Sequence, residues 1–148
     1  MNYKNIVKSD LFVFTGDLVN NVATEIEPYL DLFSKIEAPH GKYSILGNHD
    51  YGDYISWPND AEKEANLNLL KKQHSKMGFS LLLDEHITLE KNGEKIYLLG
   101  VENWGVGFGK RGNLEKSLNG LNATDFKILL SHDPSHWEQE VKQHPNKI

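Results

Sequence analysis

Residues 11–21 read LFVFTGDLVNN, an apolar run that passes directly into Thr15, Gly16 and Asp17. Four consecutive apolar residues bounded by a turn signal are typical of a buried strand. A carboxylate therefore stands at the carboxyl end of a strand, which is where open α/β sheets bind their ligands. We interpret Asp17 as a candidate ligand, the alternative being an aspartate that serves only the turn.

Three more apolar runs end in the same way, on a small residue that is followed within a few positions by a side chain able to bind a ligand. They are YSIL before Gly47-Asn48-His49-Asp50, IYLL before Gly100-Val101-Glu102-Asn103, and KILL before Ser131-His132-Asp133-Pro134. Asp17, Asn48, His49 and His132 could then converge on one edge of a sheet. Oxygen and imidazole donors without thiolates suit divalent ions such as Mn, Fe, Zn or Ni.

Helical and strand patterns alternate between these runs, which indicates the α/β class with a late antiparallel element. Strands are expected at residues 11–14, 42–46 and 126–130, and a hairpin joins 87–91 to 94–99 around Asn92-Gly93. T-E-I-E at Thr24–Glu27 and S-H-W-E at Ser135–Glu138 read as capping boxes that open helices. Asp60 is expected to cap a third helix over residues 61–77, which Gly78 ends.

Composition excludes several classes of protein. The 148 residues suit one domain, and a net charge of −5 without a long basic run argues against a nucleic-acid-binding surface. The absence of cysteine excludes thiolate chemistry. No apolar run approaches the ~18 residues of a membrane span, and no signal-peptide pattern opens the chain. A cytoplasmic location fits this sequence, but the sequence does not assign one, because a preceding region that would carry a signal or membrane segment is expected to be missing.

The motifs Gly16-Asp17, Gly47-Asn48-His49-Asp50 and the single His132 resemble, in order and placement, those of the calcineurin-like metallophosphoesterases. The resemblance covers nearly all of the chain. It implies an α-β-β-α sandwich with mixed sheets, and a metal-dependent phosphoester hydrolase, either a phosphatase or a phosphodiesterase. Such an enzyme uses two divalent ions and a metal-activated hydroxide.

The same resemblance implies a role for each matching residue. Asp17 would bridge the two ions, Asn48 and His132 would bind the second ion, and His49 would act as general acid or stabilise the transition state. Asp50 would support the site from behind the ligands. Asn20 occupies a position where the family often has Asp, so it could orient His49 without offsetting its charge.

Two family motifs are missing. No D-x-H precedes Leu11 and no G-H-x-H follows His132, and these motifs supply most ligands of the first ion and one ligand of the second. Residues 1–148 are therefore expected to be a partial metallophosphoesterase domain, incomplete at both ends. Alone, it would hold one ion or none and have impaired activity, and its open sheet edges could pair with another copy.

Two alternatives stay open. One is a non-catalytic binding or scaffold relative with a degenerate metal site. The other is a metal-independent hydrolase that uses Ser44 or Ser131 with a histidine, although neither serine lies in a nucleophile-elbow pattern.

Residues 51–60 and 102–112 form two loops that follow strand ends and could line the site. Arg111 is a candidate for bidentate phosphate contact, and Trp104 or Trp57 could stack on a substrate group. The alternative is an ordinary solvent loop with tryptophans that cap the core. The remaining histidines are expected to be surface or hydrogen-bonded residues: His40, His74, His86, His136 and His144.

Overall fold

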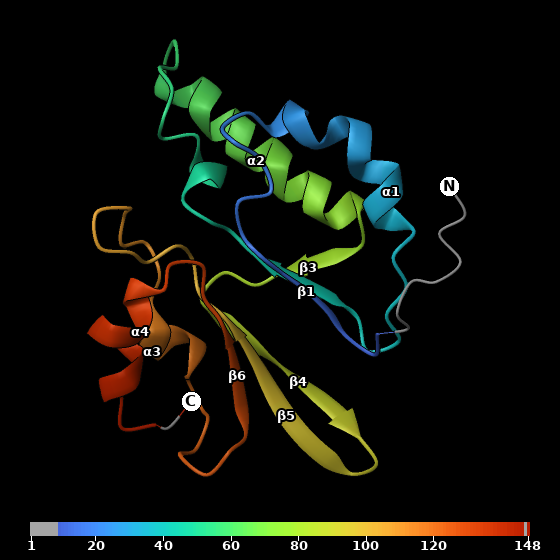
Figure 1. The fold of residues 1–148 in the computed structure, drawn as a ribbon, viewed down its shortest axis with the longest axis vertical. Coiled ribbons are helices and arrows are strands. Elements are labelled where there is room, and N and C mark those ends of the chain that lie inside the picture. Colours follow the sequence, from blue (N-terminus) through green and yellow to red (C-terminus); the bar gives the residue numbers. More distant parts are fainter. Residues whose placement is uncertain (1–8, 147) are drawn as a thin grey trace.

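The computed structural model describes residues 9–146 and 148, and it shows two three-stranded sheets between two groups of helices (Figure 1). The first sheet has the order β1-β2-β3 and the second has the order β4-β5-β6. The strands are β1 (Phe12–Thr15), β2 (Lys42–Ile45), β3 (Phe79–Leu81), β4 (Glu85–Lys91), β5 (Glu94–Gly100) and β6 (Lys127–Leu130). The helices are η1 (Ala23–Tyr29), α1 (Leu30–Ser34), η2 (His49–Tyr51), α2 (Asp60–Lys76), α3 (Leu114–Ser117), α4 (Ser135–Gln139) and η3 (Val141–Gln143).

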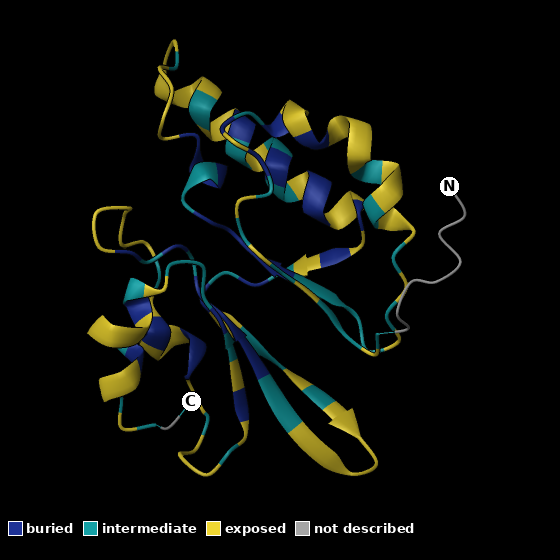
Figure 2. Ribbon diagram, in the orientation of Figure 1, coloured by how far each residue is buried: buried dark blue, intermediate teal, exposed yellow. Residues whose placement is uncertain are grey.

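Three separate apolar cores show that the layers follow the order α-β-β-α. One core joins η1 and α2 to the first sheet through residues such as Ile26, Leu70 and Phe79. A second lies between the two sheets and contains Ile45, Leu82, Leu98 and Leu130. The third joins the second sheet to α3 and η3 through Leu99, Val101, Leu114, Leu118 and Val141. Figure 2 shows these buried stretches along the strands and on the inner sides of the helices. The predicted α/β fold is confirmed.

The sequence of β2 explains why its sheet is covered on both sides. Successive side chains of a strand point to opposite faces. Tyr43 and Ile45 accordingly pack between the sheets, while Leu46, just beyond the strand, joins the core under the helices. A strand buried on both faces reads as a continuous apolar run, which is the YSIL pattern.

The directions of the strands determine at which edge of the sheets the candidate site lies. In the first sheet all pairings are parallel, β1 with β2 and β2 with β3. The second sheet is mixed, because β4 and β5 are antiparallel whereas β5 and β6 are parallel. The carboxyl ends of β1 and β2 therefore meet at one edge. Among the described residues the outer strands are β1, β3, β4 and β6, and the self-association of such edges stays a prediction.

The predicted hairpin is confirmed. Asn92 and Gly93 have φ values of 56° and 82°, the left-handed pair that a two-residue turn between β4 and β5 requires. Strand β3 and helix α3 were not predicted, because each is too short to show a clear period.

All three predicted helix caps were wrong in detail. The first helix begins at Ala23 as a 3-10 turn, and its loop is bonded by Glu25 rather than by Thr24 and Glu27. Asn59 caps α2 in place of Asp60, since the Asn59 side chain accepts from the Glu62 N–H. At α4 the Asp133 carboxylate accepts from the Ser135 N–H and hydroxyl.

No helix within residues 9–146 is long and apolar enough to cross a membrane.

The buried His74 should make stability depend on pH. Burial lowers the pKa of His74 to about 4 from its usual 6.5, and only its Nδ1 has a partner, the Ser44 hydroxyl at 2.9 Å. The folded state therefore binds this proton less readily than the unfolded state, so the stability is present above pH 6.5 and is lost toward pH 4. The loss attributable to His74 should be about 3 kcal/mol of unfolding free energy.

Urea unfolding at pH 7 and pH 4 of the wild type, His74→Gln and the half-exposed control His40→Gln measures this effect. His74→Gln should show the smaller loss of stability on acidification, and His40→Gln should follow the wild type. Equal pH dependence of all three proteins, or an NMR titration of His74 near pH 6.5, would contradict the assignment.

Candidate metal centre

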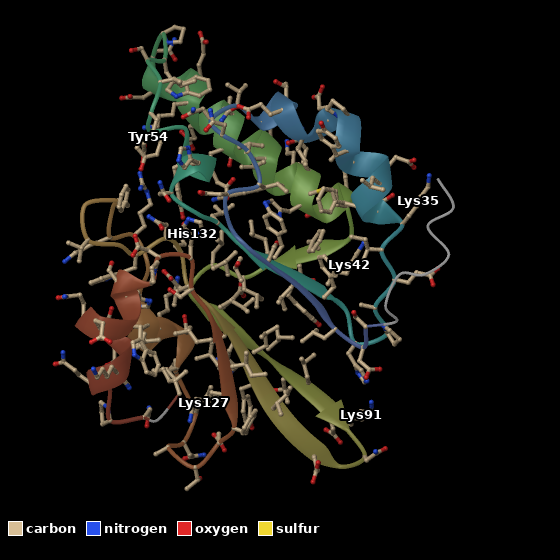
Figure 3. The ribbon with its side chains drawn as sticks, in the orientation of Figure 1. Lys35, Lys42, Tyr54, Lys91, Lys127 and His132 are labelled. Atoms are coloured by element: carbon tan, nitrogen blue, oxygen red, sulfur yellow. The ribbon has the colours of Figure 1, made fainter. Side chains whose placement is uncertain are left out.

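The ends of three strands meet at one place although they come from both sheets. Thr15 of β1 lies opposite Ile45 of β2, and Leu130 of β6 lies opposite Gly100 of β5. His132, two residues past β6, has its Nδ1 2.8 Å from the Thr15 carbonyl oxygen. Figure 3 shows His132 on the same side of the molecule as Tyr54, away from Lys42 and Lys91.

Two glycines make this close approach feasible. Gly16 has a φ of 96°, and Asp17 follows in the left-handed region at 58°, which short polar side chains tolerate. At Gly47 a Cβ atom would lie 2.6 Å from the Asp17 amide nitrogen and 2.7 Å from the His132 Cε1. Any larger residue at position 47 would therefore push two site residues apart.

Asp50 ties the two strand ends together. Its side chain is fully buried and accepts hydrogen bonds from the N–H groups of Asp17 (2.9 Å), Val19 (3.1 Å) and Gly47 (2.9 Å). Burial raises the pKa of Asp50 to about 6, with a further contribution from the nearby Asp17 carboxylate, while the N–H bonds oppose the rise. Asp50 is therefore largely ionised at neutral pH.

Asp17, Asn48 and His132 converge. His132 Nε2 lies 3.0 Å from Asn48 Oδ1 and 3.3 Å from Asp17 Oδ2. Because a carbonyl oxygen only accepts, the bond to Thr15 requires the proton on Nδ1 of His132. Nε2 is then left to face two oxygen atoms, either with a second proton or with its lone pair.

This donor set fits a divalent ion. Three ligand atoms each about 2.1 Å from an ion, at angles of about 90–110°, lie roughly 3.0–3.4 Å from one another. The two separations from His132 Nε2, 3.0 Å and 3.3 Å, fall in this range. No group of three or more His, Asp or Glu able to hold a metal occurs in the described part of the chain, so a metal site here would need the amide oxygen of Asn48.

His49 lies at the same edge of the sheet, but its imidazole is bonded to a different segment from that of His132. Its backbone N–H donates to Asp17 Oδ1 at 3.0 Å, and its Nδ1 donates to the Asn20 carbonyl oxygen at 2.8 Å. The Asn20 contact is thus made by the main chain and not by the amide side chain. A pocket of about 430 Å³ is bordered by Asp17, Asn20 and His49.

Glu25 holds the loop that orients His49, a role the sequence reading did not identify. Its carboxylate accepts from the N–H groups of Asn20 (2.8 Å), Asn21 (3.0 Å) and Val22 (2.7 Å). Although burial acts to raise it, these bonds and the nearby His49 hold the pKa of Glu25 below its usual value. The signal in the sequence was a glutamate three residues after the N-cap residue Val22, two positions before the Glu27 that we selected.

The glycine-rich loop lies against the loop that follows His49. Arg111 donates from Nη2 to Asp53 Oδ2 at 2.9 Å and lies over the Tyr51 ring, 4.1 Å from its centroid. Asp53 also pairs with Lys63. Arg111 therefore fastens the two loops together, and its contact with a phosphate stays a prediction.

Trp104 is likewise engaged within the protein. Its ring stacks on His136, with centroids 5.0 Å apart, and Lys110 Nζ lies 4.5 Å from the ring centroid. Trp57 donates to the Gly52 carbonyl oxygen at 2.7 Å. These contacts are those of side chains that fix loops, and substrate stacking by Trp104 stays a prediction.

Both serines of the alternative hydrolase are bonded to histidines. Ser44 of β2 and its partner His74 of α2 are both fully buried, so a substrate has no access to them. Ser131 Oγ lies 2.9 Å from His136 Nδ1, and His136 Nε2 lies 3.0 Å from Glu140 Oε2. This chain of contacts runs through His136 of α4, which is fully buried. It ties the turn that carries His132 to α4.

Comparison with known proteins identifies the family of the chain. The profile of the calcineurin-like phosphoesterase family matches residues 2–147. The chain therefore belongs to the calcineurin-like metallophosphoesterases.

Three relatives illustrate the similarity. The chain is 32% identical over 133 residues to YkuE of Bacillus subtilis, described as an uncharacterized metallophosphoesterase, with 88% of this chain and 42% of the relative covered. It is 25% identical to YkoQ of the same organism over 128 residues, covering 85% and 43%. It is also 24% identical over 180 residues to LpxG of Chlamydia muridarum, a UDP-2,3-diacylglucosamine pyrophosphatase, covering 94% and 51%. The chain thus spans less than half of the two Bacillus proteins.

Removing the charge of Asp50 should destabilise the whole centre. In Asp50→Asn an NH₂ group would face at least one of the three N–H donors, so that bond is replaced by a clash of donors. We expect a loss of about 2–3 kcal/mol in the free energy of unfolding at pH 7.5.

Urea unfolding of Asp50→Asn and of Asp60→Asn, an exposed aspartate in the first turn of α2, provides the comparison. The control should change stability by no more than about 0.5 kcal/mol. Similar losses in the two variants would show that the three N–H bonds to Asp50 do not support the fold.

Proposed function

We propose that the chain carries part of the metal centre of a phosphoester hydrolase. The observation that supports this most directly is the convergence of His132 Nε2, Asn48 Oδ1 and Asp17 Oδ2, with the other imidazole nitrogen bonded to the main chain. Membership in the calcineurin-like phosphoesterases supports the reaction class.

In this proposal Asp17, Asn48 and His132 would hold one divalent ion, and Asp17 would also be a ligand of the second ion of a di-metal centre. Bound Mn, Fe, Zn or Ni would draw charge from the phosphoryl oxygens and lower the pKa of a water so that it can attack phosphorus. The residues that would complete the other ion's ligand set, those of D-x-H and G-H-x-H, are not among the matching motifs of these 148 residues.

His49 is the proposed catalytic residue. Since Nδ1 is bonded to the Asn20 carbonyl, Nε2 is the nitrogen that can meet the substrate. As an imidazolium it would donate to the leaving oxygen or to a charged phosphoryl oxygen. Arg111 is a proposed second phosphate contact through its free N–H groups, held in place by Asp53.

The competing function is a scaffold or binding relative that retains the fold without catalysis. Metal binding distinguishes it from the hydrolase, because a scaffold has no need for the convergence at His132. We favour the hydrolase because His132 Nε2 lies close to a side-chain oxygen of Asn48 (3.0 Å) and to one of Asp17 (3.3 Å).

Mn²⁺ binding tests the proposal. The wild-type chain should bind at most one ion, and Asp17→Asn or His132→Ala should weaken binding at least tenfold, because each removes a ligand. His40→Ala is the control, since His40 precedes β2 at the opposite end of the first sheet. Equilibrium dialysis with elemental analysis measures the stoichiometry. Wild-type affinity in both ligand variants would contradict the site.

Turnover should be weak. With Mn²⁺ present, we expect the 148 residues to hydrolyse bis(p-nitrophenyl) phosphate or p-nitrophenyl phosphate slowly or not at all, because one ion lacks most of its ligands. Absorbance of released p-nitrophenol gives the rate, with Asp17→Asn as the background. An Asp17-dependent rate equal to that of a complete family enzyme would contradict the proposed impairment.

A further inference from the structure

Tyr54 contacts two residues of the centre, although the sequence patterns did not select it. Its hydroxyl oxygen accepts a hydrogen bond from Asn48 Nδ2 at 2.7 Å. Its ring lies against the His49 imidazole, with centroids 4.6 Å apart and an angle of 33° between the planes. The side chain comes from the loop between η2 and α2 and is nearly half exposed.

The Tyr54 hydroxyl acts on the side-chain amide of Asn48, the proposed metal ligand. Asn48 presents Oδ1 toward His132 Nε2 and Nδ2 toward Tyr54, so the two ends of one amide have opposite partners. An amide that donates from its nitrogen is polarised, and its oxygen becomes a stronger donor to a cation. The bond also holds the amide plane, which otherwise rotates freely about its terminal torsion.

The Tyr54 ring acts on His49. His49 is held on one side by the Asn20 carbonyl at Nδ1. The tilted Tyr54 ring covers a face of the imidazole and limits its rotation about that bond. One side chain therefore restrains both a proposed metal ligand and the proposed catalytic histidine.

We propose that Tyr54 is a positioning residue of this centre, whose hydroxyl sets the Asn48 amide for the metal and whose ring sets the His49 imidazole. The inference rests on the proposed function, because it assigns Asn48 to the metal. It goes beyond the family motifs, since Tyr54 lies outside Gly47-Asn48-His49-Asp50.

Two substitutions separate the two actions. Tyr54→Phe keeps the ring and removes the hydroxyl, so Mn²⁺ affinity should fall about tenfold while the NMR shifts of the His49 ring protons stay unchanged. Tyr54→Leu removes the ring as well, so the His49 ring protons should also lose their ring-current shift. Tyr43→Phe is the matched control, because Tyr43 is on β2 at the end of the sheet away from the site.

Mn²⁺ affinity is measured by electron paramagnetic resonance of the free ion, with Asp17→Asn as the reference for a lost site. The NMR signals of the Asn48 side-chain amide, recorded without metal, should shift in Tyr54→Phe and not in Tyr43→Phe. Both readouts use the 148-residue chain.

The outcomes distinguish the two proposals. If the wild type binds Mn²⁺ and Asp17→Asn does not, wild-type affinity in Tyr54→Phe overturns the role of Tyr54 and leaves the proposed function intact. If the wild type and Asp17→Asn are equally unable to bind, the proposed function fails. Tyr54 then has no metal ligand to position, which overturns this inference too.

Discussion

The buried carboxylate of Asp50 is the constraint on which the site depends. Its two oxygens accept N–H groups from the loop after β1 and from the turn after β2, so these two segments cannot move independently. One of those donors is the N–H of Asp17 itself. The Asp17 carboxylate in turn accepts the backbone N–H of His49. Burial destabilises the charged carboxylate and raises the pKa of Asp50. The three N–H bonds stabilise the charge and offset part of that effect.

Both imidazoles of the site are oriented by backbone carbonyls. Thr15 accepts from His132 and Asn20 accepts from His49, in each case at Nδ1. In many metal sites a carboxylate takes this place and raises the basicity of the ligand. Here β1 fixes the Thr15 carbonyl, and Glu25 fixes the loop that carries the Asn20 carbonyl. The orientation of His49 therefore depends on the main chain of Asn20 more than on its side chain.

Much of this arrangement could be predicted from the sequence, because strand ends and turn glycines leave strong patterns. The α/β class, the hairpin and the edge that carries Asp17 and His132 follow from apolar runs and their spacing, whereas the order of the layers came from the family resemblance. Helix caps were misplaced by one or more residues, since several adjacent polar residues compete at each helix start. Contacts such as Tyr54 with Asn48 could not be predicted, because they depend on how one loop folds back over another.

The central claim is that Asp17, Asn48 and His132 together form one metal site. Anomalous diffraction at the zinc edge, from crystals of this chain soaked in Zn²⁺, tests it most directly. We predict a peak about 2.0–2.2 Å from His132 Nε2, Asn48 Oδ1 and Asp17 Oδ2, with His132 Nδ1 still bonded to Thr15. A peak bound elsewhere, or an occupied site that leaves out Asn48, would contradict the account.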